Sequence, residues 1–551
     1  MEYLILISLM IVTAIVITIV QDKKRQKRIL DYIRSSFGVP RDDTEEQFYR
    51  LGNIETLYLM DKKSIAEHEI VDDITWEDLS MDNIFALVNH TDSYIGEQCL
   101  YSKLHDLSKT ESDLKQLEEK ISFFDTNEDK RFEVREKLYF LGKSYVNYDM
   151  PILIENISKH KLKNSKFYYA LSYLLMISIA AAIIIRKPVF IGMCIAVYLI
   201  NMIIHTIKKE KMDIKVKSVF NLGKMLNTSF SLAELVPEFS NEISEDLNTL
   251  KSTAKRSTFL EQKNATDNKD EVSMMMSYLL GPLMIDFIMY DKIISELIEK
   301  KAECMRIYKF IGEIDCSVSI ASYRKSAATY CIPKTADNDS FSFGGLVHPA
   351  ISNAIPNDIE YDRNIIITGS NASGKSTFIK STAINLILGQ TIHTCTSESA
   401  SVPKCGVITS MAVRDDILSG ESYYIREIKY LKRMIELCQE DRLLFLAIDE
   451  ILKGTNTRER IAASKAMLNY FTDKRCMLLV ATHDLELAKA FDKIFANYYF
   501  SEVIDSDDIM FDYTLHNGIN DSSNAIKLLS AIGFPDDIVD KAKEEIAKPD
   551  I

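Results

Sequence analysis

The stretch that decides the fold is Gly369-Ser370-Asn371-Ala372-Ser373-Gly374-Lys375-Ser376. It has the spacing G-x-x-x-x-G-K-S, it follows the apolar run 364–368, and Thr377 opens a helix-compatible stretch to residue 388. Glycines let the backbone curl so that its N–H groups face phosphate oxygens, and a helix N-terminus adds partial positive charge. The pattern predicts a phosphate-binding loop that includes Thr377. Lys375 is expected to reach the β- and γ-phosphates of ATP, and Ser376 to bind Mg²⁺.

Two further apolar runs, 443–448 and 477–481, end in residues that suit the same site. We interpret these runs, with 364–368, as buried strands of a parallel sheet, which predicts an α/β P-loop domain. After the first run, Asp449 suits the Mg²⁺ shell, and Glu450 is placed to orient or deprotonate the attacking water. After the second, His483 lies where open α/β sheets bind ligands and is expected to sense the γ-phosphate.

A fourth motif lies between the loop and the second strand, at 415–424, and contains Ser419, Gly420 and Ser422. By itself it indicates a turn that opens a helix, with Ser419 or Ser422 as the N-cap. Beside a P-loop it is also similar to the signature of ATP-binding-cassette ATPases, which contacts the γ-phosphate held by the other subunit. That resemblance implies a homodimer with ATP between two copies.

Composition limits the class of protein. The chain has 551 residues, 47% of them hydrophobic, and a formal charge of −14, which argues against a surface coated in basic residues but not against a local basic channel. The length suggests three or four structural units. Nine cysteines without a C-x-x-C pair or metal-ligand spacing fit a reducing cytosol.

Three apolar stretches predict membrane helices. Residues 3–20 are uncharged and are followed by Lys23, Lys24, Arg25, Lys27 and Arg28, which predicts an uncleaved anchor with the following chain in the cytoplasm. Residues 167–185 and 189–207 are separated by three residues and flanked by lysines, which predicts a helical hairpin with both ends inside. Two buried core helices are the alternative. The predicted location is the cell membrane, multi-pass, with the ATPase domain cytoplasmic and membrane lipid as a partner.

The remaining chain divides by its periodicity. Apolar residues at every third or fourth position in 75–156 and 212–327 predict an all-α core and lever region, whose charged faces are solvated. The expected boundaries are an anchor with its basic flank (1–28), a linker (29–74), a first helical part (75–166), the hairpin (167–207), a second helical part (208–335) and the ATPase domain (336–551).

Taken together, these motifs resemble the MutS family. The resemblance rests on Asp416-Ile-Leu-Ser-Gly-Glu-Ser422, on Asp449-Glu-Ile-Leu-Lys-Gly-Thr-Asn-Thr457, and on Ala481-Thr-His483. Cassette transporters place their signature closer to the second strand and usually follow the catalytic glutamate with proline. His348-Pro349, residues 517–542, and residues 83–104 are also similar to MutS segments, the last to the start of the core and lever helices.

The resemblance implies an ATP-hydrolysing, ATP-dependent DNA-binding protein whose dimer opens and closes with nucleotide. Repair members of the family carry a mismatch-reading domain with a Phe-x-Glu motif, and no such triplet occurs in residues 1–74. We therefore expect a membrane-anchored variant that lacks this domain, with possible partners in double-stranded DNA and an unidentified membrane protein. The alternative function is an ATP-driven mechanical or regulatory membrane protein with no DNA substrate.

Overall fold

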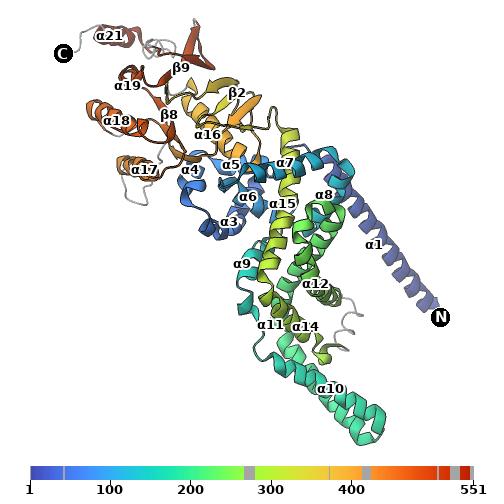
Figure 1. Ribbon diagram of the computed structural model, residues 1–551. Helices are drawn as coiled ribbons and strands as arrows, with labels where there is room; N and C mark the ends of the chain where they lie inside the picture. The colour runs from blue at the N-terminus through green and yellow to red at the C-terminus, as the bar shows by residue number, and fades with distance from the viewer. Residues whose placement is uncertain are drawn as a thin grey trace. The chain divides into compact units, whose positions relative to one another are not determined.

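The computed structural model describes residues 2–40, 44–265, 280–370, 373–411, 423–453, 455–505, 508–520 and 534–546. The chain forms two compact units, and it passes between them more than once. Unit 1 contains residues 1–60, 89–101 and 120–322, and unit 2 contains residues 61–88, 102–119 and 323–551. Figure 1 labels the helices and strands of both units.

In its described residues, unit 1 is helical. Its longer helices, or the parts of them that belong to this unit, are α1 (Glu2–Ser35), α2 (Thr44–Ile54), α6 (Tyr94–His105), α7 (Glu111–Thr126), α8 (Glu128–Leu141), α10 (Ser165–Ile185), α11 (Pro188–Leu235), α12 (Ser244–Ala265), α14 (Ile285–Glu299) and α15 (Lys301–Ser326). Shorter α-helices are α3 (Thr56–Asp61) and α9 (Met150–Glu155), and short 3-10 turns join several of the helices. The segment predicted as a linker carries α2 and α3, and it buries Ile54 and Leu57. These two side chains belong to the core of the unit.

A buried polar cluster organises the centre of unit 1. The Glu97 carboxylate accepts from Arg50 (3.1 Å), Lys143 (2.6 Å) and Tyr148. Burial by itself would raise the pKa of Glu97, but Lys143 and Arg50 outweigh it and lower the pKa to about 2. Next to it, a Cβ on Gly96 would lie 2.2 Å from Asp315 Oδ2, so only glycine permits this approach of α6 and α15. Gly96 and Glu97, the last two residues of the stretch 83–97, thus have defined structural roles.

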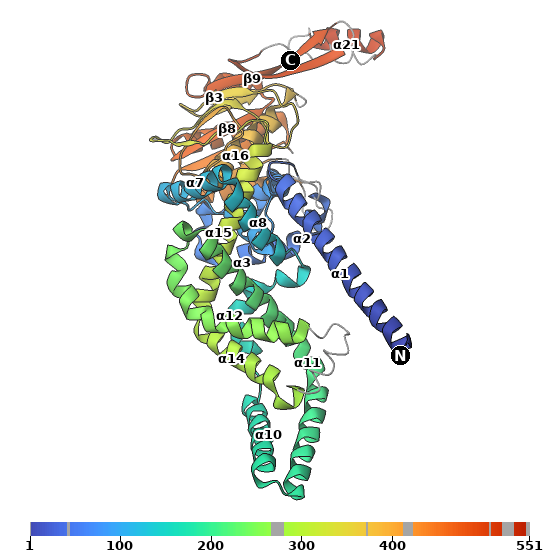
Figure 2. The same ribbon diagram turned by 90° about the vertical axis from the view of Figure 1, so that its right-hand side faces the viewer.

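Helices α10 and α11 form an antiparallel hairpin (Figure 2). Among the described residues, two segments are long and apolar enough to cross a bilayer: Ser165–Ile185 and Pro188–Lys209. Only 6% and 11% of their most apolar windows are buried within the protein. Asn201 joins the hairpin at its base, because its amide donates to the carbonyls of Leu171 and Pro282, each at 3.0 Å. A pair of buried core helices, the alternative prediction, would not leave these side chains exposed.

Unit 2 contains two sheets. The larger has the order β10-β9-β4-β8-β7-β6, and all its neighbours are parallel except β9 and β10. Its strands are β4 (Ile365–Thr368), β6 (Gly406–Ser410), β7 (Leu444–Asp449), β8 (Cys476–Thr482), β9 (Ala496–Asp505) and β10 (Asp508–Asn517). The smaller sheet has the order β1-β5-β2-β3, with β1 (Lys334–Thr335), β2 (Ser342–Leu346), β3 (Asn357–Glu360) and β5 (Ser399–Val402). The three strands predicted from sequence are therefore confirmed as β4, β7 and β8.

Helices cover both faces of the larger sheet, as its buried apolar strands require. On one face, side chains of β7 and β8 form a core with α17 (Tyr423–Leu437), α18 (Thr457–Thr472) and α19 (Leu485–Phe491). Helix α16 (Lys375–Ile392) contacts β7 and β8 and does not contribute to that core, so it covers the other face.

The edge strand β6 is covered by α4 (Asp73–Asp78), whose Asp78 carboxylate accepts from Thr409 and Met411. This contact prevents β6 from presenting a free edge.

Unit 2 also contains α5 (Met81–Val88) and α21 (Asp536–Ile546).

Candidate functional site

The phosphate-binding loop connects β4 to α16, as its sequence predicts. Gly369 and Gly374 have φ angles of +138° and +106°, which disfavour any side chain. A Cβ on Gly369 would also lie 2.8 Å from the carbonyl oxygen of Phe500. The Lys375 side chain is 1% exposed, and its Nζ donates to the carbonyls of Gly369 (2.6 Å) and Ser370 (2.7 Å). The ammonium group therefore lies within the curve of the loop.

Glu450 and His483 meet beside this loop. One oxygen of the Glu450 carboxylate contacts His483 Nε2, and the other lies 2.8 Å from Lys453 Nζ. The second ring nitrogen of His483, Nδ1, lies 3.0 Å from the carbonyl oxygen of Gly369. Burial would raise the pKa of Glu450, but the hydrogen bonds from His483 and Lys453 outweigh it and lower the pKa to about 2. Glu450 is therefore an anion at neutral pH.

The turn after β7 holds Glu450 in an unusual backbone conformation. Glu450 and Leu452 have φ angles of +67° and +56°, a region that residues other than glycine seldom adopt. The Glu450 N–H donates to the carbonyl of Ala481 at 3.0 Å, which ties the turn to β8. Strain of this kind persists where the surrounding structure imposes it, and it is common at functional sites.

The helix after this turn also fixes the segment that carries His483. The Asn456 side chain caps α18 by accepting from the Glu459 N–H at 2.9 Å. One turn into α18, Arg460 makes a bidentate pair with Asp484, at 2.9 and 2.8 Å. Since Asp484 directly follows His483, this pair orients the histidine.

Asp449 and Ser376 offer oxygen atoms at the carboxyl edge of the sheet. Asp449 ends β7, and Ser376 is the second residue of α16, which begins just after β4. Strands β4 and β7 lie on either side of β8, so both residues belong to one edge. A carboxylate and a hydroxyl, both partly exposed, are the kind of ligand that Mg²⁺ takes alongside phosphate oxygens and water. The residues present fit this ion.

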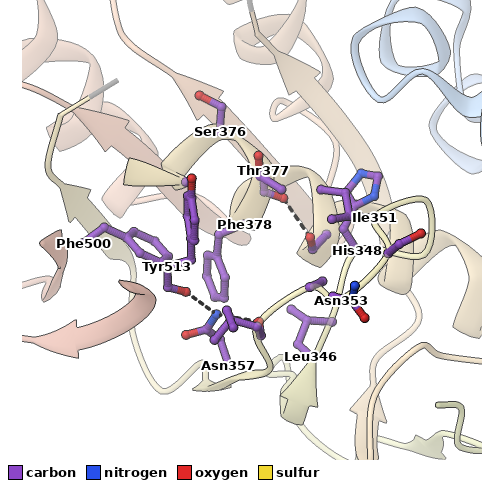
Figure 3. Close-up of a pocket in the computed structure, with 15 residues that line it drawn as sticks. Leu346, His348, Ile351, Asn353, Asn357, Ser376, Thr377, Phe378, Phe500 and Tyr513 are labelled. Carbon is purple, nitrogen blue, oxygen red and sulfur yellow. Dashed lines mark hydrogen bonds between the residues drawn. The ribbon is translucent and has the colours of Figure 1, made fainter. Parts of the chain in front are cut away.

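A cavity of about 530 Å³ adjoins the loop (Figure 3). Its walls come from the start of α16, from the connection between β2 and β3, and from β9 and β10. Phe378 and Phe500 contact each other edge to face, with their ring centroids 5.8 Å apart, and Tyr513 lies beside them (Figure 3). Aromatic side chains beside a phosphate-binding loop form a surface on which a flat heterocyclic base can stack.

Two polar side chains, Asn357 and His348, also line this cavity. Asn357 donates to the carbonyl of Tyr513 at 3.0 Å and accepts from the Leu515 N–H at 2.6 Å, which fixes the β10 bulge that carries Tyr513. Burial, and then the charge of Lys380, lower the pKa of His348 to about 4. Its imidazole is therefore neutral at physiological pH and lies on the cavity wall as a hydrogen-bonding group.

The structure brings together most of the residues predicted from sequence. Gly369, Ser370, Ser373, Gly374, Lys375, Ser376 and Thr377 lie in one loop and helix start, with Glu450 and His483 beside it. Asn371 and Ala372 lie outside the described residues, and so does the predicted signature with Ser419, Gly420 and Ser422.

Sequence reasoning assigned no role to Lys453 or to the wall residues Phe500 and Tyr513. Lys453 lies three residues after Glu450, a spacing that could have suggested the ion pair. Phe500 and Tyr513 follow Lys375 by more than a hundred residues and belong to no motif near the loop. No local pattern distinguishes them from other aromatic residues.

Residues 365–549 match the protein family MutS domain V. The chain is 30% identical to the DNA mismatch repair protein MutS of Pseudothermotoga lettingae over 46% of this chain and 32% of that protein. It is 28% identical to the same protein of Petrotoga mobilis over 47% of this chain and 33% of that protein. For Chlorobaculum parvum MutS the identity is 25%, over 59% and 37%. The matched part spans about a third of the length of these relatives. These findings show that the C-terminal part of this chain is similar to MutS domain V.

Proposed function

We propose that this chain, whose C-terminal part is a MutS domain V, is a membrane-anchored ATPase that couples nucleotide-dependent dimer closure to binding of duplex DNA. The observation that carries the proposal is the convergence of Lys375, Glu450 and His483 on the loop that begins at Gly369. Hydrolysis of a phosphoanhydride requires a cation that binds phosphate, here Lys375, and an anion that orients water, here Glu450. The ring nitrogen of His483 adds a polar group beside them.

ATP would bind with its base in the cavity and its phosphates along the loop. The aromatic walls formed by Phe378, Phe500 and Tyr513 suit a purine, and the N–H groups at the start of α16 suit phosphate oxygens. Lys375 would exchange its two bonds to loop carbonyls for bonds to the β- and γ-phosphates. Mg²⁺, held by Ser376 and Asp449, would neutralise charge on the same phosphates.

Glu450 would position the attacking water rather than remove its proton in advance. A carboxylate with a pKa of about 2 is a weak base, but it is a strong acceptor for a water hydrogen bond. His483 contacts both Glu450 and the loop. It would hydrogen-bond the γ-phosphate when ATP is bound, and its contact with the Glu450 carboxylate would change as a result. The strained turn at Glu450 would hold the carboxylate in place for this role.

The hairpin α10–α11 would cross the membrane. Its apolar side chains are exposed along both helices, including Ile184 (78%) and Val189 (70%), and water is a poor solvent for such a surface. Residues 3–20, at the start of the continuous helix α1, would form a separate anchor. Lysines before α10 and in the middle of α11 would keep the ATPase domain in the cytoplasm.

The DNA part of the proposal rests on the relatives, which are named DNA mismatch repair proteins. The test is binding of matched, mismatched and branched duplexes by the full chain in lipid nanodiscs, at two salt concentrations, with and without ATP. We expect binding that depends on nucleotide and weakens steeply with salt, because phosphate contacts release counterions. Normal ATP hydrolysis without binding to any duplex would instead favour a mechanical ATPase that acts on the membrane or on a protein partner.

A further inference from the structure

The first helix of unit 1 carries a basic groove that the ATPase function does not use. The groove has a volume of about 780 Å³, and it is lined by Gln21, Asp22, Arg25, Arg28, Ile29, Tyr32 and Tyr139. All except Tyr139, which belongs to α8, lie on one face of α1, because they recur at helical spacing. Neither arginine has an ion-pair partner among the residues that the structure describes. Both guanidinium groups are therefore available to an anion.

The two walls of the groove are held together firmly. The Tyr32 and Tyr139 rings are in contact, with their centroids 6.1 Å apart. Just beyond them, Arg135 of α8 donates to the Ile33 carbonyl and to the Ser36 hydroxyl, and Arg34 of α1 lies over the Phe132 ring at 4.6 Å. The groove is thus a fixed junction of two helices rather than a single solvated helix face.

The position of the groove relative to the proposed anchor identifies its ligand. At about 1.5 Å per helical residue, Arg25 and Arg28 lie roughly 8 and 12 Å beyond Val20, the last residue of the apolar run. Headgroups occupy about 5–8 Å on each side of the hydrocarbon core. Helical side chains lean toward the N-terminus, which for Arg28 is toward the membrane, and long arginine side chains reach into this layer.

The chemistry of the groove fits a phosphodiester. Arginine binds phosphate oxygens with two parallel N–H bonds, and tyrosine hydroxyls can donate to the same oxygens. The Asp22 carboxylate and the Gln21 amide, on the same face, accept hydrogen bonds and suit a headgroup with hydroxyl groups. We infer that this groove binds the phosphate and hydroxylated headgroup of an anionic phospholipid such as phosphatidylglycerol. This inference rests on the proposed membrane anchoring.

The chain offers a matched control for this site. Lys23 and Lys27 carry the same charge as Arg25 and Arg28 and lie in the same turns of the helix, but at about 100° per residue they lie on the opposite face of α1, away from the groove. The variants are therefore Arg25→Gln with Arg28→Gln, Lys23→Gln with Lys27→Gln, and Tyr139→Phe. Full-length protein in an uncharged detergent would be titrated with short-chain phosphatidylglycerol, short-chain phosphatidylcholine and inorganic phosphate.

We expect the double arginine substitution to weaken phosphatidylglycerol binding by roughly tenfold or more. The double lysine substitution is expected to change this binding by less than about twofold. Tyr139→Phe is also expected to weaken phosphatidylglycerol binding. Phosphatidylcholine and inorganic phosphate are expected to bind the wild-type protein less tightly than phosphatidylglycerol does. An equal loss of phosphatidylglycerol affinity in the arginine and lysine variants would mean that the lipid is attracted by overall charge, and it would overturn the site. A Tyr139→Phe variant with wild-type affinity would overturn the site as well. Equal affinity for inorganic phosphate would overturn a lipid site in favour of a free anion. Loss of duplex DNA binding in the arginine variant, with lipid binding intact, would assign the groove to DNA.

Vesicle flotation separates this inference from the proposed membrane location. The arginine variant is expected to float with phosphatidylglycerol vesicles like the wild type, because the apolar run and the hairpin are unchanged. A wild-type chain that does not float would overturn the membrane location itself. Flotation with identical lipid affinity in all variants would overturn only the headgroup site.

Discussion

At the scale of single residues, the nucleotide site depends on a few charged groups held in conformations that their neighbours impose. Lys375 lies inside the curve of the loop, and Glu450 is held between His483 and Lys453 on a strained turn. Each of these groups has a separate expected role, so single substitutions can distinguish binding from hydrolysis.

Lys375→Ala is expected to raise the Kd for ATP by roughly 100-fold, because it removes charge-assisted bonds to two phosphates. Binding of a fluorescent ATP analogue would measure the change. Lys465→Ala, on α18, provides a control that removes one positive charge away from the loop. Retention of wild-type affinity by the Lys375 variant would refute the assignment of the phosphate-binding loop.

Glu450→Gln is expected to leave ATP binding within a few fold of wild type and to slow hydrolysis by roughly 100-fold or more. The amide keeps the size of the side chain but loses the charge that orients water. Steady-state phosphate release and ATP binding would be compared with Glu436→Gln, an exposed glutamate of α17. A variant that hydrolyses ATP at the normal rate would exclude Glu450 from the reaction.

At the scale of elements, unit 2 ties the end of the P-loop helix to two other helices through one arginine. Arg324, near the end of α15, makes a bidentate pair with Glu118 of α7, both bonds at 2.7 Å. It also donates to the His393 carbonyl (2.8 Å) and the Thr394 hydroxyl (2.9 Å), just after α16 ends. The middle of α7 and the C-terminal ends of α15 and α16 are therefore joined by one hydrogen-bonded cluster.

Glu118 gives this cluster a defined dependence on pH. Burial would raise the pKa of Glu118, but the hydrogen bonds from Arg324 and His393 outweigh it and lower the pKa to about 2, from an ordinary 4.5. A lowered folded-state pKa means that the stabilisation is complete above about pH 4.5 and is lost as the pH falls toward 2. Glu118→Gln is expected to reduce the free energy of unfolding by about 1 kcal/mol at pH 7, after allowance for solvent screening, and by less below pH 4.

Denaturant unfolding of wild type and variant between pH 3 and 7 would measure this difference. Glu111→Gln, also on α7 but paired with Lys115 on the surface, is the control and is expected to have no measurable effect. A difference between wild type and Glu118→Gln that stays constant down to pH 3 would contradict the lowered pKa.

At the scale of the whole molecule, the proposal combines an ATPase unit with membrane segments in one chain. The membrane segments are proposed from exposed apolar side chains in α10 and α11 and from the sequence of residues 3–20. The dimer is proposed from the resemblance of residues 415–424 to a trans-acting signature. These two features can be tested separately.

Removal of residues 1–28, together with replacement of residues 167–207 by a short flexible linker, is expected to release the protein from membranes. Vesicle flotation would be compared for the full chain, each single deletion and the combined deletion, with ATP binding as the measure of folding. Persistent flotation of a combined variant that still binds ATP would require another anchor.

The Glu450→Gln variant is also expected to accumulate as an ATP-bound dimer, because the ATP between the two copies is hydrolysed only slowly. Light scattering with and without ATP would detect a doubling of the protein mass. Ser422→Ala in the same background is expected to weaken the dimer. A Glu450→Gln chain that stays monomeric with saturating ATP would contradict the trans-acting signature.

Some features of the protein were predictable from sequence because their signals are local. The phosphate-binding loop has fixed glycine spacing, and strands β4, β7 and β8 are short apolar runs that end in polar residues of the site. A buried parallel strand needs apolar residues on both faces, so it is visible without any knowledge of its neighbours. The motif Asp449-Glu450 and the position of His483 followed from these strand ends.

Only the tertiary structure determined the cavity, the ion pairs of Glu450 and the groove between α1 and α8. Phe378 and Tyr513 meet at one cavity although 135 residues separate them in the sequence, and Arg25 and Tyr139 are 114 residues apart. Such contacts depend on how helices and sheets pack, because the free energy of packing is gained by complementary surfaces and not by neighbours in the chain. The sequence by itself determined the chemistry of the ATPase motifs, and folding determined which distant side chains surround them.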